Sequence, residues 1–471
     1  MVESMKTIVL GLDGAHFELI DPWIEEGELP NLKKMKEEGC WADMKVCLPP
    51  VTSPNWKCYS TGKNPAELGI FWWENIDVKN RRVYYPQDRK FNHKEIWDYL
   101  GEEGYKVGII GTPLTYPARD INGLMVSGGP DAENNSKAIS GEFKKRPGFK
   151  VRPNTPMKAD RIKSAEETVK LIEHNFREAL DLFEREGLDF MQFTSFNINV
   201  LHHFLWDHEK TLEGWKVIDK YLGKLMEKDC QTFIMSDHGS NKIETIFNIN
   251  IWLEKEGYLK TKKNLFQKLG LSSDVLIKLT SKLKIYPFLR RILPDKILRK
   301  LPSKGGEVKR EGKEDIIDWE KSKAVASGQG PIYLIDKEYK KEIKNKLEGL
   351  KDPKGNEVIN KVYEKEEIYS GKYIKEAPDL IIDQAKGVHI PGGLGQDKVF
   401  GLEVPWVSEN KKTGMFMAYG PKIKSKGRIE GVSILDLAPT ILRLHGTRKP
   451  KGMDGKVIEK IKKQGRVVKN E

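Results

Sequence analysis

The stretch TIVLGLDG, residues 7–14, joins a short apolar run to an abrupt polar turn. A run of this length and character is typical of a buried parallel strand, which Asp13-Gly14 would end. Further runs of the same kind follow along the chain, in KVGIIG (106–111), GLMVSGG (123–129), DFMQFTSF (189–196) and TFIMSDHG (232–239). Because helical segments separate these runs, the sequence predicts an α/β fold with a mostly parallel central sheet flanked by helices.

The composition is that of a folded protein. Hydrophobic residues make up 38% of the 471 residues and charged residues 32%, which excludes wholesale disorder. The first residues lack the pattern of a secretory signal, and no apolar run approaches the roughly 18 residues needed to cross a membrane. The four Cys contain no CxxC pair, so neither a disulfide scaffold nor a cysteine zinc site is expected. We therefore expect a cytoplasmic protein.

The net charge of +12 is concentrated in one segment. Residues 260–313 contain 16 Lys and Arg against 4 Asp and Glu, so the rest of the chain is neutral. Nucleic-acid binding over the whole surface is therefore not expected. Between residues 262 and 312, apolar residues recur at three- and four-residue steps, which predicts short amphipathic helices. Such a segment can contact an anionic membrane peripherally, steer an anionic substrate, or form a solvated lid.

This change of pattern predicts an inserted basic helical cap. We expect a core in two parts, which the cap divides and a polar tail follows. The expected ranges are 1–255 for the first part, 256–315 for the cap, 316–456 for the second part with a small lobe at 336–372, and 457–471 for the tail. The sequence contains no internal repeat.

Polar residues with catalytic potential lie where the predicted strands end. Asp13 follows TIVLGL, Asp237-His238 follows TFIMS, and Thr52 stands at the start of a helix, with Pro54 expected at the first helical position. In a parallel sheet, ligands bind at this edge. Two carboxylates and an imidazole there could hold a divalent metal, which would activate the Thr52 hydroxyl as a nucleophile. Taken singly, the Thr is more often a helix cap and the Asp-Gly a turn.

Taken together, these residues resemble the alkaline phosphatase superfamily, and within it the type I phosphodiesterase/nucleotide pyrophosphatase family. The resemblance covers nearly the whole chain, in VLGLDGAHFELIDPWIEEGELPNLKKMKEEG (9–39), PPVTSPNWKCYSTGKNPAELGI (49–70), IWDYLGEEGYKVGIIGTPLTYP (96–117), MSDHGS (235–240), IDWEKSKAVASG (317–328) and SILDLAPTILRLHG (433–446). It implies an alkaline-phosphatase-like core and metal-dependent hydrolysis of a phosphodiester or nucleotide pyrophosphate bond. Thr52 would form a phospho-enzyme, and Asp13, Thr52, Asp237 and His238 would hold the first metal ion.

The second metal site of the family is altered in this sequence. The family's ligands are an Asp-x-x-x-His pair and a distal His, and these positions align with Asn199, His203 and Asn410. An Asn offers only a neutral oxygen, which is a weaker zinc ligand than carboxylate or imidazole. Replacement ligands could come from His202, Asp207, His208 or His389. The resemblance therefore implies one or two divalent ions, with zinc favoured and manganese or magnesium as alternatives.

Three residues are predicted to bind substrate. The Asn that stabilises phosphate in the family aligns with Trp73, and Asn75, two residues later, could replace it. Asn55, on the nucleophile helix, is the third candidate. The substrate would be a phosphorylated small molecule or lipid. The leaving group and the oligomeric state stay open.

The resemblance also leaves other activities to consider. The chain could be a degenerate relative that binds a phosphorylated ligand without turnover, or a phosphotransferase that acts on a lipid or sugar phosphate. A sulfatase is disfavoured because its nucleophile lies in a C/S-x-P-x-R pattern, whereas residues 52–56 read TSPNW. A cofactor-independent phosphoglycerate mutase is disfavoured because it needs both metal sites complete.

Overall fold

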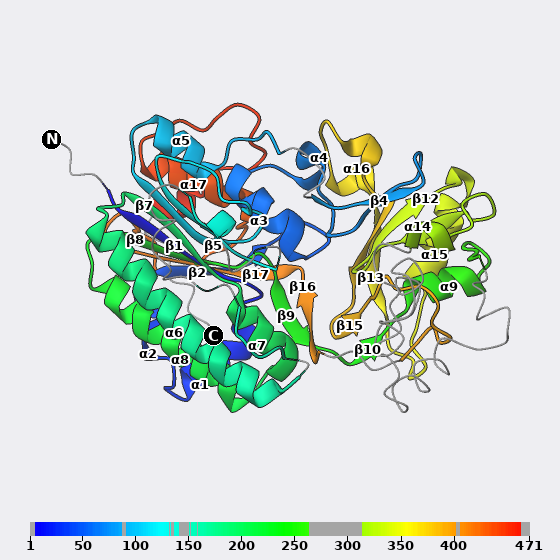
Figure 1. The fold of residues 1–471 in the computed structure, drawn as a ribbon, viewed down its shortest axis with the longest axis horizontal. Coiled ribbons are helices and arrows are strands. Elements are labelled where there is room, and N and C mark those ends of the chain that lie inside the picture. Colours follow the sequence, from blue (N-terminus) through cyan, green and yellow to red (C-terminus); the bar gives the residue numbers. More distant parts are fainter. Residues whose placement is uncertain are drawn as a thin grey trace. The chain divides into compact units, whose positions relative to one another are not determined.

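The computed structural model describes residues 5–86, 91–130, 132, 136–140, 150, 152–157, 159–262, 313–401 and 406–462. The chain divides into two compact units (Figure 1). The first comprises Met1–Leu68, Phe91–Lys242 and Trp406–Glu471, and the second comprises Gly69–Lys90 and Ile243–Pro405. Residues 263–312, which include nearly all of the predicted basic cap, lie outside the described residues.

The first unit is built on a mixed sheet, which among the described residues has eight strands in the order β18-β2-β17-β8-β1-β7-β5-β6. The strands are β1 (Thr7–Leu12), β2 (Cys40–Lys45), β5 (Val107–Thr112), β6 (Gly123–Ser127), β7 (Phe190–Ser195), β8 (Gln231–Met235), β17 (Thr413–Tyr419) and β18 (Gly427–Arg428). Strands β8, β1, β7, β5 and β6 run parallel, whereas β17 is antiparallel to both its neighbours, β2 and β8. The predicted α/β fold with a mostly parallel central sheet is confirmed.

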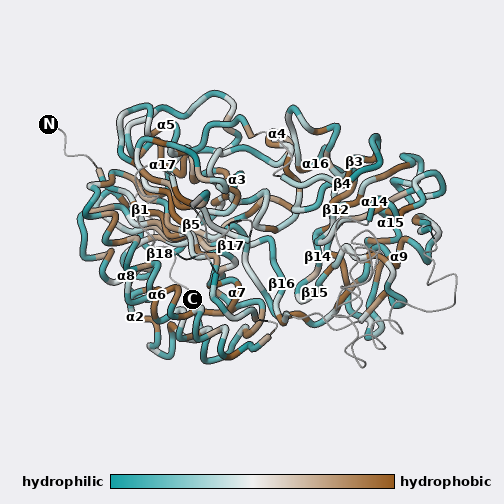
Figure 2. The backbone as a smooth tube through the Cα atoms, in the orientation of Figure 1, coloured by the Kyte–Doolittle hydropathy of each residue, from teal (hydrophilic) through white to brown (hydrophobic). Residues whose placement is uncertain are grey.

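Helices cover both faces of this sheet (Figure 1). The first face carries α1 (Phe17–Glu25), α2 (Pro30–Glu38), α6 (Arg161–Arg185), α7 (Asn197–Leu205) and α8 (Glu209–Met226), and the second carries α3 (Thr52–Thr61), α5 (Ile96–Glu102) and α17 (Leu437–Leu444). Successive side chains of strand β1 point to opposite faces of the sheet and so contribute to two cores. Ile8 and Leu10 pack with the first layer, and Val9 packs with the second. In Figure 2 the hydrophobic strands lie between the two layers.

Shorter elements complete the first unit. They are α4 (Pro65–Leu68), the antiparallel pair β9 (Gly239–Lys242) and β16 (Ser408–Lys411), and the 3₁₀ turns at Ser136–Ala138, Ile434–Asp436 and Glu459–Lys462. The start of the predicted polar tail is docked, because Ile461 is fully buried in the same core as α3 and α17. Among the described residues, no helix combines the length and the apolar character needed to cross a membrane.

The second unit contains an antiparallel sheet with its own core. Its described strands follow the order β11-β12-β14-β13, namely Ala324–Ala326, Pro331–Leu334, Leu380–Gln384 and Ile359–Glu364. The other elements are β3 (Asn75–Asp77), β4 (Arg82–Tyr84), β10 (Thr245–Ile246), α9 (Ile249–Lys255), α14 (Lys313–Ile316), α15 (Lys340–Glu348), α16 (Lys365–Ile368), β15 (Val388–His389) and the 3₁₀ turns Lys337–Tyr339 and Ile374–Glu376. The predicted small lobe, 336–372, contributes β13 to this sheet.

The described residues on either side of 263–312 lie side by side in the second unit. Thr261 pairs with Ile317, and the amide of Lys262 donates to the carbonyl of Ile316 at 2.7 Å. The described residues before and after this segment are therefore adjacent in the second unit. The predicted boundaries at 255, 315 and 456 stay predictions.

His445, at the end of α17, should make the stability of the protein sensitive to acid. Its Nε2 lies 3.0 Å from the hydroxyl of Thr7, and Tyr105 packs against its ring. Burial lowers the pKa of His445 to about 4. Below the unfolded-state pKa of about 6.5, the unfolded chain binds a proton that the folded chain excludes. Stability should therefore fall as the pH drops from about 6.5 to about 4, by up to about 3 kcal/mol from this residue.

Urea unfolding at a series of pH values tests this expectation. His445→Gln should be less sensitive to pH than the wild type over that range, because glutamine takes up no proton. His174→Gln, on α6, is the control and should keep the wild-type slope. Equal slopes for His445→Gln and wild type would contradict the expectation.

Candidate active site

Thr52 occupies the first position of the buried helix α3. Val51, the residue before it, has an extended backbone and offers no side chain to cap the helix. The backbone N–H groups of Thr52 and Ser53 in the first turn therefore have no side-chain cap, an arrangement that favours an anion, whereas Pro54 has no N–H. The helix begins two residues before the predicted start, so Pro54 is its third residue rather than its first. All ten residues of α3 are buried.

A buried ion pair anchors α3 to the loop before α5. The ammonium group of Lys57 lies 2.8 Å from Glu95, and the hydroxyl of Ser60 donates to the same carboxylate oxygen. Arg119 contacts the other oxygen of Glu95 at 3.3 Å. Because breaking a buried pair of this kind costs several kcal/mol, the pair holds the helix in a fixed position.

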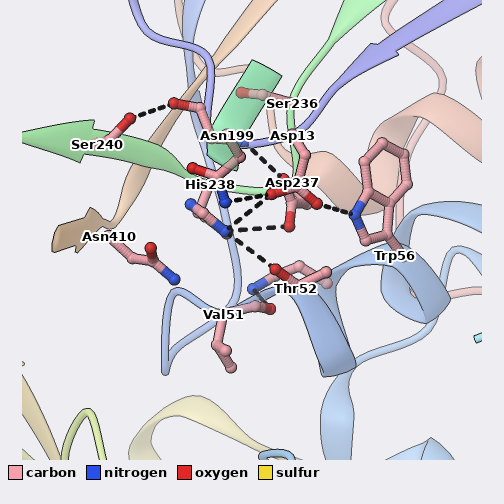
Figure 3. A network of polar contacts seen from close by, with 12 residues as sticks. Asp13, Val51, Thr52, Trp56, Asn199, Ser236, Asp237, His238, Ser240 and Asn410 are labelled. Atoms are coloured by element: carbon pink, nitrogen blue, oxygen red, sulfur yellow. Dashed lines mark hydrogen bonds and ion pairs between the residues drawn. The ribbon is translucent and has the colours of Figure 1, made fainter. Parts of the chain in front are cut away.

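Asp13 and Asp237 emerge side by side from neighbouring strands. Strands β1 and β8 are parallel, with Gly11 opposite Met235, so the residues two positions beyond each leave the sheet at the same edge. His238 lies between them, with its Nε2 3.6 Å from Asp13 Oδ1 and 3.2 Å from Asp237 Oδ2. One potential ligand atom from each of the three lies within 4.8 Å of the others (Figure 3). Within the part of the chain that is described, no other such group of three is found.

Thr52 belongs to the same cluster. Its hydroxyl oxygen lies 3.3 Å from Nε2 of His238, and its residue is only 5% exposed. Nδ1 of His238 lies 2.9 Å from the carbonyl of Gly239, which can only accept, so we assign the ring proton to Nδ1. The lone pair of Nε2 then faces Thr52 and both carboxylates. A lone pair directed at carboxylate oxygens is repulsive unless a cation or a proton lies between them.

The electrostatics of the cluster favour a bound cation. Asp13, Asp237 and His238 are fully buried. Burial, aided by the charge of Asp237, raises the pKa of Asp13 well above its usual range, and burial raises the pKa of Asp237 to about 7. Burial also lowers the pKa of His238, against the opposing effect of Asp13. Among the described residues, no Lys or Arg pairs with either carboxylate. Two carboxylate oxygens and one imidazole nitrogen fit a divalent ion of the zinc or manganese type.

Asn199 lies against Asp13. Its Nδ2 donates to Asp13 Oδ1 at 2.6 Å, and the indole N–H of Trp56 donates to Asp13 Oδ2 at 2.9 Å. Gly14 makes room for Asn199, because a Cβ at this position would lie 2.2 Å from the amide oxygen of Asn199, and its φ of +67° also favours glycine. The first predicted residue of the second metal site is thus a hydrogen-bond donor to the first site.

The other two residues of the predicted second site come from α7 and β16. His203 lies one turn after Asn199, and its Nδ1 is 2.9 Å from the carbonyl of Ser408. Asn410 is 4% exposed and pairs with Ser240 across the β9–β16 ladder. Figure 3 shows its amide turned toward the space beside Thr52 and His238. The structure therefore brings two amides beside the first site, and among the described residues no third carboxylate joins Asp13 and Asp237 in the group of potential metal ligands.

The candidate replacement ligands have other surroundings. His202 Nε2 accepts a hydrogen bond from Trp215 at 3.0 Å, and burial lowers the pKa of His202 to about 3. His208 caps α8, where its Nδ1 accepts from the amide of Lys210. Asp207 is exposed, and His389 belongs to the second unit.

The predicted substrate-binding amides are engaged in local structure. Oδ1 of Asn55 accepts from the amide of Cys47, and its Nδ2 lies within bonding distance of backbone carbonyls in residues 47–51. Asn75, in the second unit, braces a turn in the same way, since its Oδ1 accepts from the amides of Phe71 and Trp72. Trp73, also in the second unit, is half-buried. Substrate contact by these three residues stays a prediction.

Trp56 is the residue of the site that the sequence analysis missed. It lies four positions after Thr52, so both side chains share one face of α3. That spacing was available in the sequence. What the sequence lacks is the direction in which this face points.

Comparisons with known proteins identify the family and the fold. The family model described as type I phosphodiesterase/nucleotide pyrophosphatase matches residues 7–415. Phosphonoacetate hydrolase from Sinorhizobium meliloti 1021, in complex with phosphonoacetate, has a similar structure, with a TM-score of 0.58 at 15% identity and coverage of 92% of this chain and 94% of that one. Human ectonucleotide pyrophosphatase/phosphodiesterase 5 gives a TM-score of 0.54 at 14% identity, covering 97% and 98% of the two chains.

An inactive threonine-to-alanine variant of the murine ectonucleotide pyrophosphatase/phosphodiesterase 5, in complex with AMP, gives 0.52 at 13% identity, covering 95% and 96%. No curated protein matches the chain. The solved structures show the fold, and the family model spans most of the sequence, so the resemblance inferred from the motifs is confirmed. The chain belongs to the type I phosphodiesterase/nucleotide pyrophosphatase family of the alkaline phosphatase superfamily.

Proposed function

We propose that the protein is a metal-dependent phosphodiesterase or nucleotide pyrophosphatase that acts through a phosphothreonine at Thr52. Its broader class, a phosphoester hydrolase of the phosphodiesterase/pyrophosphatase type, follows from the family match and agrees with the fold neighbours. The finer proposal is carried by one observation. The hydroxyl of Thr52 lies 3.3 Å from His238, beside two buried carboxylates and at the N-terminus of a helix that no side chain caps.

Each residue has a separate task in this proposal. Asp13, Asp237 and His238 would hold a divalent ion, which lowers the pKa of the Thr52 hydroxyl when bound. Thr52 loses its proton to solvent and attacks phosphorus. The Oγ1–P bond forms while the bond from phosphorus to the leaving-group oxygen breaks. The first-turn N–H groups of α3 stabilise the negative charge on the phosphoryl oxygens. The oxygen of a water molecule then bonds to phosphorus as the Oγ1–P bond breaks, which releases the phosphorylated product and returns a proton to Oγ1.

The altered second site supports a reaction with one firmly held ion. Asn199 already donates to Asp13, so it offers a fixed dipole where the family has a charged ligand. His203 lies within bonding distance of the Ser408 carbonyl. Zinc is the favoured ion because the donor set contains imidazole, and manganese and magnesium are the alternatives.

The relatives bear on the class of substrate. One has phosphonoacetate bound and another has AMP bound, so both bind small phosphorus-containing anions. We extend this to the present chain as hydrolysis of a small phosphodiester or nucleotide pyrophosphate, with a lipid or sugar phosphate as the alternative. The predicted peripheral membrane contact of residues 262–312 lies, apart from Lys262, outside the described residues. Co-sedimentation with anionic liposomes at low salt tests this membrane contact, and absence of binding would contradict it.

Hydrolysis of bis-p-nitrophenyl phosphate tests the proposal directly. The protein is stripped with a chelator and assayed with zinc, manganese, cobalt, magnesium and calcium in turn. We expect no turnover in the stripped protein and recovery with zinc or manganese. Unchanged turnover after chelation would contradict the metal requirement. Absence of turnover with every ion and with nucleotide substrates would instead favour a non-catalytic binder of phosphorylated ligands.

A further inference from the structure

Helix α3 contacts the metal-binding cluster through two side chains one turn apart. Thr52 meets His238, and Trp56 meets Asp13. Residues four apart lie on the same face of a helix, so a single rigid element carries both contacts. The position of the nucleophile and the orientation of one carboxylate are therefore set together.

The indole of Trp56 is held firmly in the core. The residue is fully buried, and its ring packs so closely on β1 that a Cβ at Gly11 would lie 2.5 Å from it. The ring of Tyr59 meets it edge-on, with centroids 6.0 Å apart, and the hydroxyl of Tyr59 is fixed by Gln192 at 2.5 Å. An indole N–H is a donor only, and here its acceptor is Asp13 Oδ2 at 2.9 Å.

The two oxygens of Asp13 have different surroundings as a result. Oδ2 accepts from Trp56, whereas Oδ1, which accepts from Asn199 at 2.6 Å, is the oxygen that lies 3.6 Å from His238 Nε2. A carboxylate that can rotate must lose that freedom when it binds a metal, and a fixed donor on the far oxygen removes this cost beforehand. The hydrogen bond from Trp56 should therefore strengthen metal binding by Asp13, in addition to the packing that Trp56 provides.

We propose that Trp56 is a positioning residue for the metal-binding carboxylate, and that it ties the orientation of Asp13 to the helix that carries Thr52. The proposal rests on the proposed function, since it assumes that Asp13 binds the metal. A purely structural tryptophan would affect the free energy of unfolding and leave the affinity for metal unchanged. Removing an outer-shell donor of this kind typically weakens metal binding by about 10- to 100-fold.

Trp56→Phe in the full-length protein tests the proposal, because it removes the N–H and keeps an aromatic ring. Zinc affinity of the stripped protein is measured by competition with a chromophoric chelator, without any substrate. We expect the affinity of Trp56→Phe to fall by about 10-fold or more. Trp97→Phe is the matched control. Trp97 on α5 is equally buried, and its N–H has no hydrogen-bond partner among the described residues, so its replacement should leave zinc affinity unchanged.

A spectroscopic measurement covers the case in which Trp56→Phe fails to fold. In an NMR spectrum of the ¹⁵N-labelled wild type, one of the 11 tryptophan indole signals should move when zinc is added, and Asp13→Asn should move the same signal. If folded Trp56→Phe binds zinc as tightly as the wild type, the role of Trp56 is overturned. The same holds if the wild type binds zinc and no indole signal responds. Either result leaves the proposed function standing. A wild type that binds no divalent ion would overturn both.

Discussion

Replacing Thr52 by alanine should lower the rate of phosphodiester hydrolysis by about 10³-fold or more, because the reaction loses the atom that attacks phosphorus. The fold should be unchanged, since the change removes a single hydroxyl, whose oxygen lies 3.3 Å from His238 Nε2. Metal affinity should change far less than the rate, because Asp13, Asp237 and His238 remain to bind the ion. Steady-state rates with bis-p-nitrophenyl phosphate, measured at saturating metal, give the comparison.

The neighbouring residue provides the control for this variant. Ser53 also carries a hydroxyl, is fully buried on α3, and its hydroxyl has no hydrogen-bond partner among the described residues. Ser53→Ala removes an oxygen from the same helix and should keep nearly all activity. A second readout is the mass of acid-quenched protein, which should show a phosphorylated species in the wild type and none in Thr52→Ala. Equal rates from Thr52→Ala and wild type would rule out Thr52 as the nucleophile.

Restoring the carboxylate and imidazole ligands of the family should create a second metal site. The double variant Asn199→Asp, Asn410→His replaces two amides by a carboxylate and an imidazole, next to His203. Without metal, the carboxylate introduced by Asn199→Asp would place a second negative charge at hydrogen-bond distance from Asp13 Oδ1, where Asn199 now donates at 2.6 Å. The stripped variant should therefore be less stable than the wild type, by about 3 kcal/mol. With zinc it should regain that stability and bind about two ions per chain, against about one in the wild type.

Metal content after gel filtration and thermal unfolding with and without zinc measure these effects. The single variants are the controls. Asn199→Asp alone should reproduce the loss of stability, and Asn410→His alone should leave the stability of the stripped protein close to that of the wild type. Two ions per chain in the wild type would show that the amides already suffice, and would overturn the proposal of one firmly held ion.

The cluster of Asp13, Asp237 and His238 could be predicted from sequence because its residues lie at strand ends. An apolar run that stops at a polar pair indicates both a buried strand and the edge at which it ends, and parallel strands bring such ends together. Asp13, Asp237 and His238 therefore meet as expected, although 224 positions separate the two carboxylates. The resemblance to the family added the role of Thr52, which a helix start alone does not assign.

The partners of the predicted amides could not be derived in this way. Asn55 and Asn75 were candidates for substrate binding, yet each braces the backbone of its own loop, because a short amide side chain is satisfied by whichever carbonyls and N–H groups the turn brings near. Only the path of the backbone determines which groups those are.

What the sequence by itself determined was the α/β class, the five parallel strands of the first unit, the family, and the identity of the groups at the sheet edge, since these depend on local pattern and on motif spacing. The tertiary structure alone decided that Asn199 binds Asp13 across 186 positions and that the indole of Trp56 holds the other oxygen of the same carboxylate. The physical reason is that hydrogen bonds are directional. A hydrogen bond needs its donor and acceptor within about 3 Å and nearly in line, and that geometry comes from how α3 and α7 pack on the two faces of the sheet.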